Sequence, residues 1–143
     1  MAIKPPKKIS HVGIAVKSLE ETLPFYTDVL GLTLEGYETV ESEKVRVAFL
    51  TIGETRLELL EATSSESPIA KFIEKKGEGI HHVAFQVEEI SDQLQTLKKQ
   101  EIRLIHEAPK VGAHQSLVAF LHPKSSHGVL VELCEPQVKQ NDR

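Results

Sequence analysis

The chain has 143 residues, of which 40% are hydrophobic and 27% are charged, and its formal net charge is −4. This length and composition predict one globular unit that is large enough to bury a core. The negative charge and the scattered lysines and arginines argue against a nucleic-acid partner. No apolar run is long enough to span a membrane, and the single cysteine, Cys134, allows no internal disulfide, so we expect a cytoplasmic protein with no membrane partner.

The first half of the chain predicts a strand, a helix and three further strands. Residues 1–8 contain two prolines and three lysines and are expected to form a flexible arm. Apolar alternation and helical periodicity predict the elements that follow, which are a strand at 9–16, a helix at 19–30, and strands at 32–39, 45–52 and 55–61. Gly53 and Glu54 join the last two strands in a tight turn.

The second half repeats this order after a helical linker at 64–79. The linker contains a helix from Pro68 to Lys76, with the proline in its first turn. The predicted elements after it are a strand at 80–87, a helix at 91–100, and strands at 102–106, 116–121 and 128–134. The chain therefore repeats the order β-α-β-β-β.

The two repeats carry the same chemical groups at matching places. His11 lies in the strand at 9–16, and His82 lies 71 residues later in the strand at 80–87. Glu58 and Glu132 both lie within apolar strands and are 74 residues apart. Offsets that agree within three residues are typical of a duplication with a small loop difference.

We therefore predict an α+β fold in which two tandem βαβββ modules form a curved pseudo-twofold shell of sheet. The predicted organisation is an arm at 1–8, a single domain at 9–135 and a flexible tail at 136–143. Within the domain, the first module covers about 9–63 and the second about 80–135.

Strand alternation places each histidine on the face with small residues. His11 shares its face with Gly13 and Ala15, and His82 shares its face with Ala84 and Gln86. The bulky residues of both strands point the other way, so space is left in front of each imidazole. His81 alternates to the opposite face from His82 and is expected to pack.

A divalent cation would explain the two glutamates. Glu58 and Glu132 would each cost several kcal/mol if they were buried without a partner. A cation shared by His11, Glu58, His82 and Glu132 would remove that cost, and this ligand set suits Zn²⁺, Co²⁺, Mn²⁺, Ni²⁺ or Fe²⁺. Positions left open for water or substrate would make the site catalytic.

Several stretches of the chain resemble one known family. Two are specific, namely Ser-Pro-Ile-Ala-Lys-Phe at 67–72 and Phe-Leu-His-Pro-Lys-Ser at 120–125. The other similar stretches are 11–16, 25–32, 79–85, 109–114 and 128–133. Together with the doubled module and the His–Glu–His–Glu set, they resemble the vicinal oxygen chelate superfamily, with its glyoxalase-like fold, and within it the methylmalonyl-CoA epimerases. The similarity covers about residues 9–135.

This resemblance implies an isomerase that interconverts (2R)- and (2S)-methylmalonyl-CoA by removing and returning the C2 proton through an enolate. It implies a CoA thioester as substrate, one divalent metal ion (Co²⁺, Mn²⁺, Zn²⁺ or Ni²⁺) and a homodimer. His11, His82 and Glu132 match the metal-binding positions of the family, Glu58 stands where some members have glutamine, and Glu132 is the expected catalytic base.

The second acid/base group is open, because residues 44–47 offer no carboxylate where family members have a second catalytic glutamate. The candidates are Glu43, a metal-bound water, or a group from the loop at 110–115, where His114 could cover the pocket. Lys124 and the backbone of 112–116 are candidate partners for the substrate carboxylate or the CoA phosphates.

Three other functions fit parts of the pattern. Glyoxalase I uses the same fold and a His–Glu–His–Glu site, but acts on a glutathione hemithioacetal. A ring-cleaving dioxygenase would use two histidines and a glutamate to hold Fe²⁺, and would consume oxygen. A drug-sequestering protein of this fold would need no metal ligands.

Overall fold

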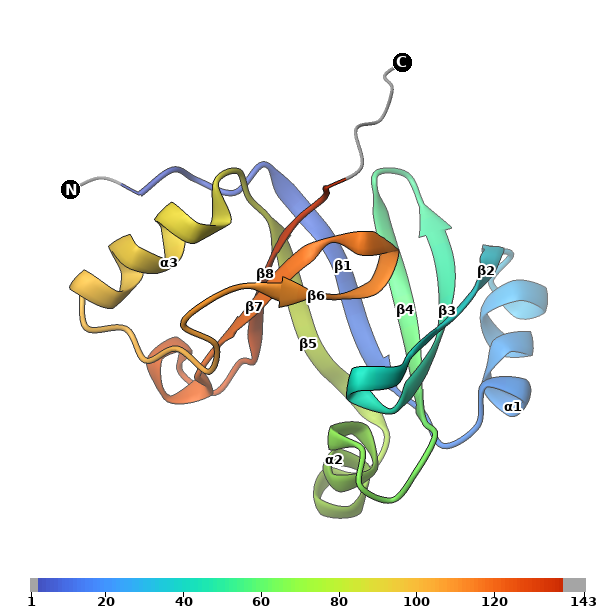
Figure 1. The fold of residues 1–143 in the computed structure, drawn as a ribbon. Coiled ribbons are helices and arrows are strands. Elements are labelled where there is room, and N and C mark those ends of the chain that lie inside the picture. Colours follow the sequence, from blue (N-terminus) through green and yellow to red (C-terminus); the bar gives the residue numbers. More distant parts are fainter. Residues whose placement is uncertain (1–2, 138–143) are drawn as a thin grey trace. The chain divides into compact units, whose positions relative to one another are not determined.

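The structure is a computed structural model that describes residues 3–137 of the chain (Figure 1). It divides into two compact units. The N-terminal unit runs from His11 to His81, and the C-terminal unit combines the chain from His82 onwards with the residues before His11. Of the predicted arm and tail, residues 1–2 and 138–143 lie outside the described part of the chain.

The strands of the N-terminal unit have the order β2-β3-β4-β1. β1 pairs with β4 in parallel, and the other neighbours pair antiparallel. The strand bounds are β1, Lys8–Ala15; β2, Thr33–Val40; β3, Val45–Ile52; and β4, Thr55–Ala62. β1 begins with three residues assigned to the C-terminal unit.

The strands of the C-terminal unit have the matching order β5-β8-β7-β6. β5 pairs with β8 in parallel, and β7 pairs antiparallel with both β8 and β6. The strand bounds are β5, Gly79–Gln86; β6, Lys110–Val111; β7, Leu117–Leu121; and β8, Val131–Glu135. The predicted duplication is therefore visible in the topology, since each unit pairs its first and last strands in parallel.

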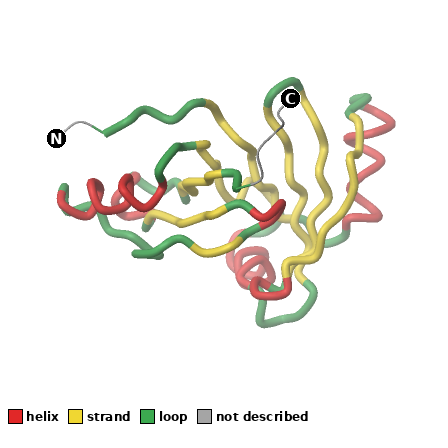
Figure 2. The backbone as a smooth tube through the Cα atoms, turned by 45° about the horizontal axis from the view of Figure 1, so that its top comes forward, coloured by secondary structure: helices red, strands yellow, loops and turns green. Residues whose placement is uncertain are grey.

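The α-helices lie at or close to the positions that the sequence predicts. α1 covers Leu19–Pro24, α2 covers Pro68–Lys76 and α3 covers Ile90–Lys99. α2 has the predicted bounds, and its start is capped by the Ser67 hydroxyl, which accepts a hydrogen bond of 3.1 Å from the N–H of Ile69. In Figure 2 the helix α1 lies beside the strands of its own unit.

The helix predicted over 19–30 changes its winding part-way. After α1, residues Phe25–Val29 form a π-helical turn, in which the N–H of Leu30 donates to the carbonyl of Phe25. Pro24 is the reason, because it has no N–H to continue the α-helical hydrogen-bond ladder. Short 3-10 turns occur at Glu41–Glu43, Ala113–Gln115 and Pro123–Ser126.

Each unit has its own hydrophobic core between its helix and its sheet. In the N-terminal unit the buried members are Val16, Leu19, Leu23, Ala48, Leu50 and Leu59. In the C-terminal unit they are Val87, Ile90, Leu94, Ala119, Leu121 and Leu133. The cores take alternate residues of β4 and β8, so Glu58 and Glu132 point to the opposite face of each sheet.

A glutamate at the end of each parallel strand caps the helix of its unit. Glu61 of β4 accepts a hydrogen bond of 2.9 Å from the N–H of Leu19, the first residue of α1. Glu135 of β8 accepts from the N–H groups of Glu89 and Ile90, at 3.1 and 3.0 Å, where α3 begins. Carboxylates are favoured there by the exposed N–H groups and by the helix dipole.

The prediction of a strand at 102–106 was wrong. That stretch forms only an isolated bridge between Leu104 and Leu121, and the edge strand is β6. Backbone bonds from Ile105 to Phe120 and from His122 to Arg103 remain, but the N–H of Phe120 donates to Nδ1 of His106 at 3.1 Å and not to a backbone carbonyl. The unit keeps the order β-α-β-β-β with a two-residue edge strand.

A β-bulge in β2 decides which of its residues face each side. The register with β3 pairs Leu34 with Leu50 and Gly36 with Phe49, so Glu35 is an extra residue between them. A bulge of this kind reverses the alternation beyond it. No helix in the described residues is long and apolar enough to cross a membrane.

Candidate metal centre

His11 and Glu58 form a buried pair in the N-terminal unit. Nδ1 of His11 lies 3.3 Å from Oε2 of Glu58, and each side chain is only 6% exposed. The parallel register of β1 and β4 places Gly13 directly opposite Glu58. Glycine therefore leaves room beside the carboxylate, as the alternation of the sequence predicts.

Arg56 also contacts this carboxylate. Its Nη2 lies 3.4 Å from Oε2 of Glu58, and its guanidinium lies 5.6 Å from the ring centroid of Phe49. Among the described residues, Nε of Arg56 is buried and has no hydrogen-bond partner. The guanidinium places positive charge beside the buried Glu58 carboxylate and so offsets part of the cost of burying it.

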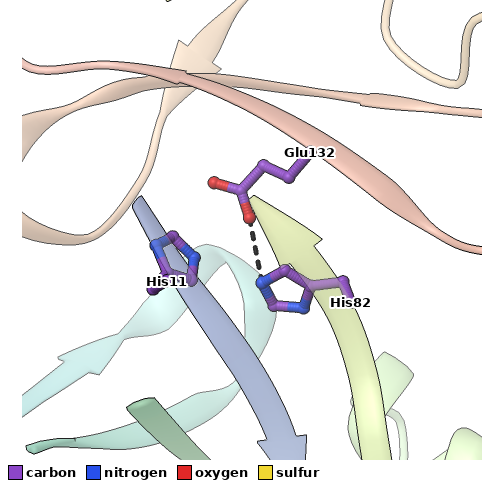
Figure 3. A group of neighbouring side chains, drawn as sticks. All are labelled: His11, His82 and Glu132. Atoms are coloured by element: carbon purple, nitrogen blue, oxygen red, sulfur yellow. Dashed lines mark ion pairs between the residues drawn. The ribbon is translucent and has the colours of Figure 1, made fainter. Parts of the chain in front are cut away.

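His82 and Glu132 form the corresponding pair in the C-terminal unit. Nε2 of His82 lies 3.0 Å from Oε1 of Glu132, and each side chain is 6% exposed (dashed line in Figure 3). The register of β5 with β8 places Ala84 directly opposite Glu132. Each unit thus holds a buried histidine beside a glutamate, with a small residue opposite the glutamate, although His11 faces its partner with Nδ1 and His82 with Nε2.

The Phe120 ring contacts the His82 imidazole, and the His106 ring in turn contacts Phe120. The His82 ring meets the edge of the Phe120 ring at a centroid distance of 5.4 Å, and the ring of His106 lies 5.8 Å from Phe120. No pattern in the sequence places His106 near His82. The position of His106 depends on the hydrogen bond that its Nδ1 accepts from the N–H of Phe120, in β7. No local pattern in the sequence indicates this bond.

The other candidates have definite places within their own units. His81 packs against Phe72, with ring centroids 5.0 Å apart, which confirms its predicted packing role. Glu43 ends the 3-10 turn after β2, where its carbonyl accepts a hydrogen bond from the Ser67 hydroxyl. His114 and Lys124 are exposed and lie in 3-10 turns of the C-terminal unit.

The donor chemistry fits a divalent metal ion. Each unit offers one imidazole and one carboxylate, and all four side chains are buried. Buried imidazoles beside anionic carboxylates suit transition metal ions and Zn²⁺, because neutral nitrogen and anionic oxygen are the ligands these ions take.

The family model for the glyoxalase/bleomycin resistance protein/dioxygenase superfamily matches residues 10–120. The chain belongs to this superfamily. The match covers 111 of the 143 residues and includes His11, Glu58 and His82.

Relatives that are named as epimerases are similar to the chain over most of its length. The chain is 43% identical over 127 residues to the mitochondrial methylmalonyl-CoA epimerase of Mus musculus, a match that covers 88% of this chain and 71% of the mouse protein. It is 40% identical to the ethylmalonyl-CoA/methylmalonyl-CoA epimerase of Cereibacter sphaeroides, covering 88% of this chain and 96% of that protein.

A solved structure shows the same fold with a ligand. It is the Streptomyces coelicolor methylmalonyl-CoA epimerase, a single-residue variant in complex with 2-nitronate-propionyl-CoA. Its TM-score is 0.89 at 34% sequence identity, and the match covers 94% of this chain and all of that one. These comparisons confirm the predicted vicinal oxygen chelate fold.

Proposed function

We propose that this glyoxalase-superfamily chain is a methylmalonyl-CoA epimerase, an isomerase that interconverts the (2R) and (2S) forms of methylmalonyl-CoA. The observation that carries the proposal is the buried His–Glu pair of each unit, set in a chain that resembles named epimerases over most of its length. The epimerase relatives and the bound CoA analogue in a homologous structure favour this reaction over the glyoxalase I reaction.

The proposed metal ligands are His11, Glu58, His82 and Glu132. In support, His82 and Glu132 form a buried pair in the C-terminal unit (Figure 3), and His11 and Glu58 form a buried pair in the N-terminal unit. Glu58 is bound to His11 and would join the group from the same strand pair. We propose Co²⁺, Mn²⁺, Zn²⁺ or Ni²⁺ as the ion, since each accepts nitrogen and carboxylate ligands.

A bound divalent ion would supply positive charge beside the substrate oxygens, where negative charge develops in the enolate. The residues of the chain provide the proton chemistry. Glu132 is the proposed base that removes the C2 proton, and its bond to His82 holds its carboxylate in place. Glu58, whose Oε2 lies 3.4 Å from Nη2 of Arg56, is proposed as a metal ligand with no part in the proton transfer.

Two further proposals concern assembly and location. We propose a homodimer, as in other members of the superfamily, and a sedimentation measurement of the purified chain tests it. We propose a cytoplasmic location, supported by the single buried cysteine, Cys134, and by the absence of a spanning helix from the described residues.

Deuterium exchange tests the proposed reaction directly. The metal-loaded protein is incubated with (2R)-methylmalonyl-CoA in deuterated water, and the substrate is followed by NMR and chiral chromatography. We expect deuterium at C2 together with formation of the (2S) isomer. A protein that loads metal but neither exchanges nor inverts this substrate would overturn the epimerase assignment. Parallel incubation with glutathione hemithioacetal measures the competing lyase reaction.

A further inference from the structure

We infer that His106 is a positioning residue for the buried pair of His82 and Glu132, and that it acts through the ring of Phe120. All four residues belong to the C-terminal unit. The inference deepens the proposed function, and its kinetic part rests on that function, because Glu132 is the proposed base. Its structural part concerns only how the side chains of this unit hold one another.

Phe120 lies beside both members of the pair. It is the direct register partner of Glu132 in the pairing of β7 with β8, so the two side chains lie on the same face of the sheet. The Phe120 ring also meets the His82 ring with a centroid distance of 5.4 Å and an interplanar angle of 83°. Aromatic rings favour this edge-to-face arrangement. One aromatic side chain therefore borders the imidazole and the carboxylate.

The backbone of Phe120 is turned away from Glu132. Its N–H donates to Nδ1 of His106, and its carbonyl accepts a hydrogen bond of 2.9 Å from the N–H of Ile105. Phe120 and Glu132 are therefore a non-hydrogen-bonded pair of the antiparallel ladder. In such pairs the Cα atoms are only about 4.5 Å apart and the side chains approach each other closely. The Phe120 ring thus limits the Glu132 side chain on the β7 side, whereas Ala84 leaves space on the β5 side.

The N-terminal unit has a phenylalanine at the matching position, and that ring is held differently. Phe49 of β3 is the register partner of Glu58. It precedes Phe120 by 71 residues, which is also the offset between the two histidines. β3 lies between two eight-residue strands, and Phe49 is only 2% exposed. β7 has the two-residue strand β6 on its outer side, and Phe120 is half-buried. The C-terminal ring therefore needs a further contact to hold it.

His106 supplies this contact through its side chain and its backbone. Its Nδ1 accepts the N–H of Phe120 at 3.1 Å, and its own N–H donates to the Phe120 carbonyl at 3.3 Å. Its ring lies 5.8 Å from the Phe120 ring. An accepting Nδ1 carries no proton, so the His106 side chain provides Phe120 with a hydrogen-bond acceptor. This acceptor takes the place of a strand carbonyl, because the segment at 102–106 makes only a single bridge to β7.

A fixed Phe120 ring keeps the pair in one arrangement. A catalytic group has to be held within about 0.5 Å of its productive position. Without the acceptor of His106, the N–H of Phe120 would lose its partner and the ring could shift. His82 and Glu132 would then no longer be held 3.0 Å apart. The proton-transfer step should slow, while substrate binding should change little, because His106 acts through Phe120 and not on the substrate.

Replacement of His106 tests the kinetic part. In His106→Ala we expect the kcat of epimerisation to fall by about 10–100-fold, the usual effect of removing a group that orients a ligand or base, with little change in KM. His106→Asn keeps an acceptor oxygen close to the position of Nδ1 and should recover most of the lost rate. His106→Leu fills the space without an acceptor and should not recover it.

NMR of the metal-free protein tests the structural part without substrate. The ring protons of His82 lie close to the Phe120 ring and should show a ring-current shift. This shift should become smaller in His106→Ala and return in His106→Asn. Glu135→Ala is the matched control, because it removes the cap of α3 in the same unit without touching Phe120. It should lower the melting temperature and leave both kcat and the His82 shift unchanged.

Three results would overturn the role of His106. They are wild-type kcat and an unchanged His82 shift in a folded His106→Ala variant, a failure of His106→Asn to recover more than His106→Leu, and an equal loss of kcat in Glu135→Ala. Circular dichroism and metal content check that each variant is folded and loaded. A wild-type chain that does not epimerise the substrate would refute the proposed function, and the His82 shift in the variants would then decide the role of His106.

Discussion

Ala84 lies directly opposite Glu132 in the parallel pairing of β5 with β8, as Gly13 lies opposite Glu58 in the pairing of β1 with β4. Ala84 is completely buried. The small residue is therefore a requirement of the site in both halves, because a longer side chain would occupy the space beside the carboxylate.

Enlarging Ala84 should damage both stability and the site. Ala84→Leu inserts three carbon atoms at a fully buried position and is expected to lower the free energy of unfolding by about 1–3 kcal/mol. It should also weaken metal binding, because the new side chain crowds Glu132. Urea denaturation and metal titration measure the two effects. Unchanged metal affinity would show that the space opposite Glu132 is not needed.

Replacing the proposed base should remove activity and keep the fold. Glu132→Gln retains the size of the side chain and an oxygen close to His82, so we expect a melting temperature near that of the wild-type protein. The rate of epimerisation should fall by about 10²–10⁴-fold. Steady-state kinetics with metal-saturated protein provide the measurement, and a variant close to the wild-type rate would exclude Glu132 as the base.

Metal removal should inactivate the protein and destabilise it. A chelator should abolish epimerisation, and added Co²⁺ or Mn²⁺ should restore it. A ligand that binds only the folded state, at 100 times its dissociation constant, adds about 2.7 kcal/mol to the free energy of unfolding. Thermal melts with and without metal test this, with His82→Ala as the variant that should respond least. Full activity in protein shown by elemental analysis to be metal-free would contradict the proposed site.

The glutamate cap of α3 should contribute measurable stability. Glu135→Ala leaves the N–H groups of Glu89 and Ile90 without their carboxylate, and should cost about 1 kcal/mol. Glu107 provides a matched control, because its carboxylate forms an exposed ion pair with Lys98. Glu107→Ala should change the free energy of unfolding by about 0.5 kcal/mol or less. Equal effects of the two substitutions would show that the cap is not specific.

Lowering the pH should weaken the ion pair that joins Glu88 to Lys7, just before β1. A hydrogen bond from Lys7, at 2.9 Å, and the charges of Lys7 and Lys4 hold the pKa of the Glu88 carboxyl below its ordinary value. Its contribution to stability is therefore present above the pKa of the unfolded state and is lost as the pH falls through the folded pKa. NMR titration should show this pKa rising in Lys7→Met. Added salt should reduce the difference, because both groups are exposed.

Local pattern was sufficient for most of the strands. The period of two placed His11 and His82 on the faces with small residues, and in the structure each histidine lies beside a glutamate of the parallel neighbouring strand. Strand β3 and helix α2 have the predicted bounds, because both lie between strong turn or cap signals.

Non-local bonds account for what the sequence could not indicate. α3 begins one residue before Ser91, since its first N–H groups bind Glu135, which lies 45 residues further along the chain from Ile90. The strand expected at 102–106 is reduced to a single bridge, and there the N–H of Phe120 binds the His106 side chain, which lies 14 residues away in sequence. Glu38 could not be assigned to a face from the sequence, because the bulge before it reverses the alternation of β2.

That bulge lets β2 absorb a change of length without changing its partners. Leu34 pairs with Leu50 and Gly36 pairs with Phe49 on either side of Glu35, so a chain without Glu35 could keep both pairs and all those beyond them. The loss of a single codon at this edge strand would therefore leave the register of β3 and β4, and with it the position of Glu58, unchanged. The length of β2 can thus vary among related chains while the buried His–Glu pairs stay in place.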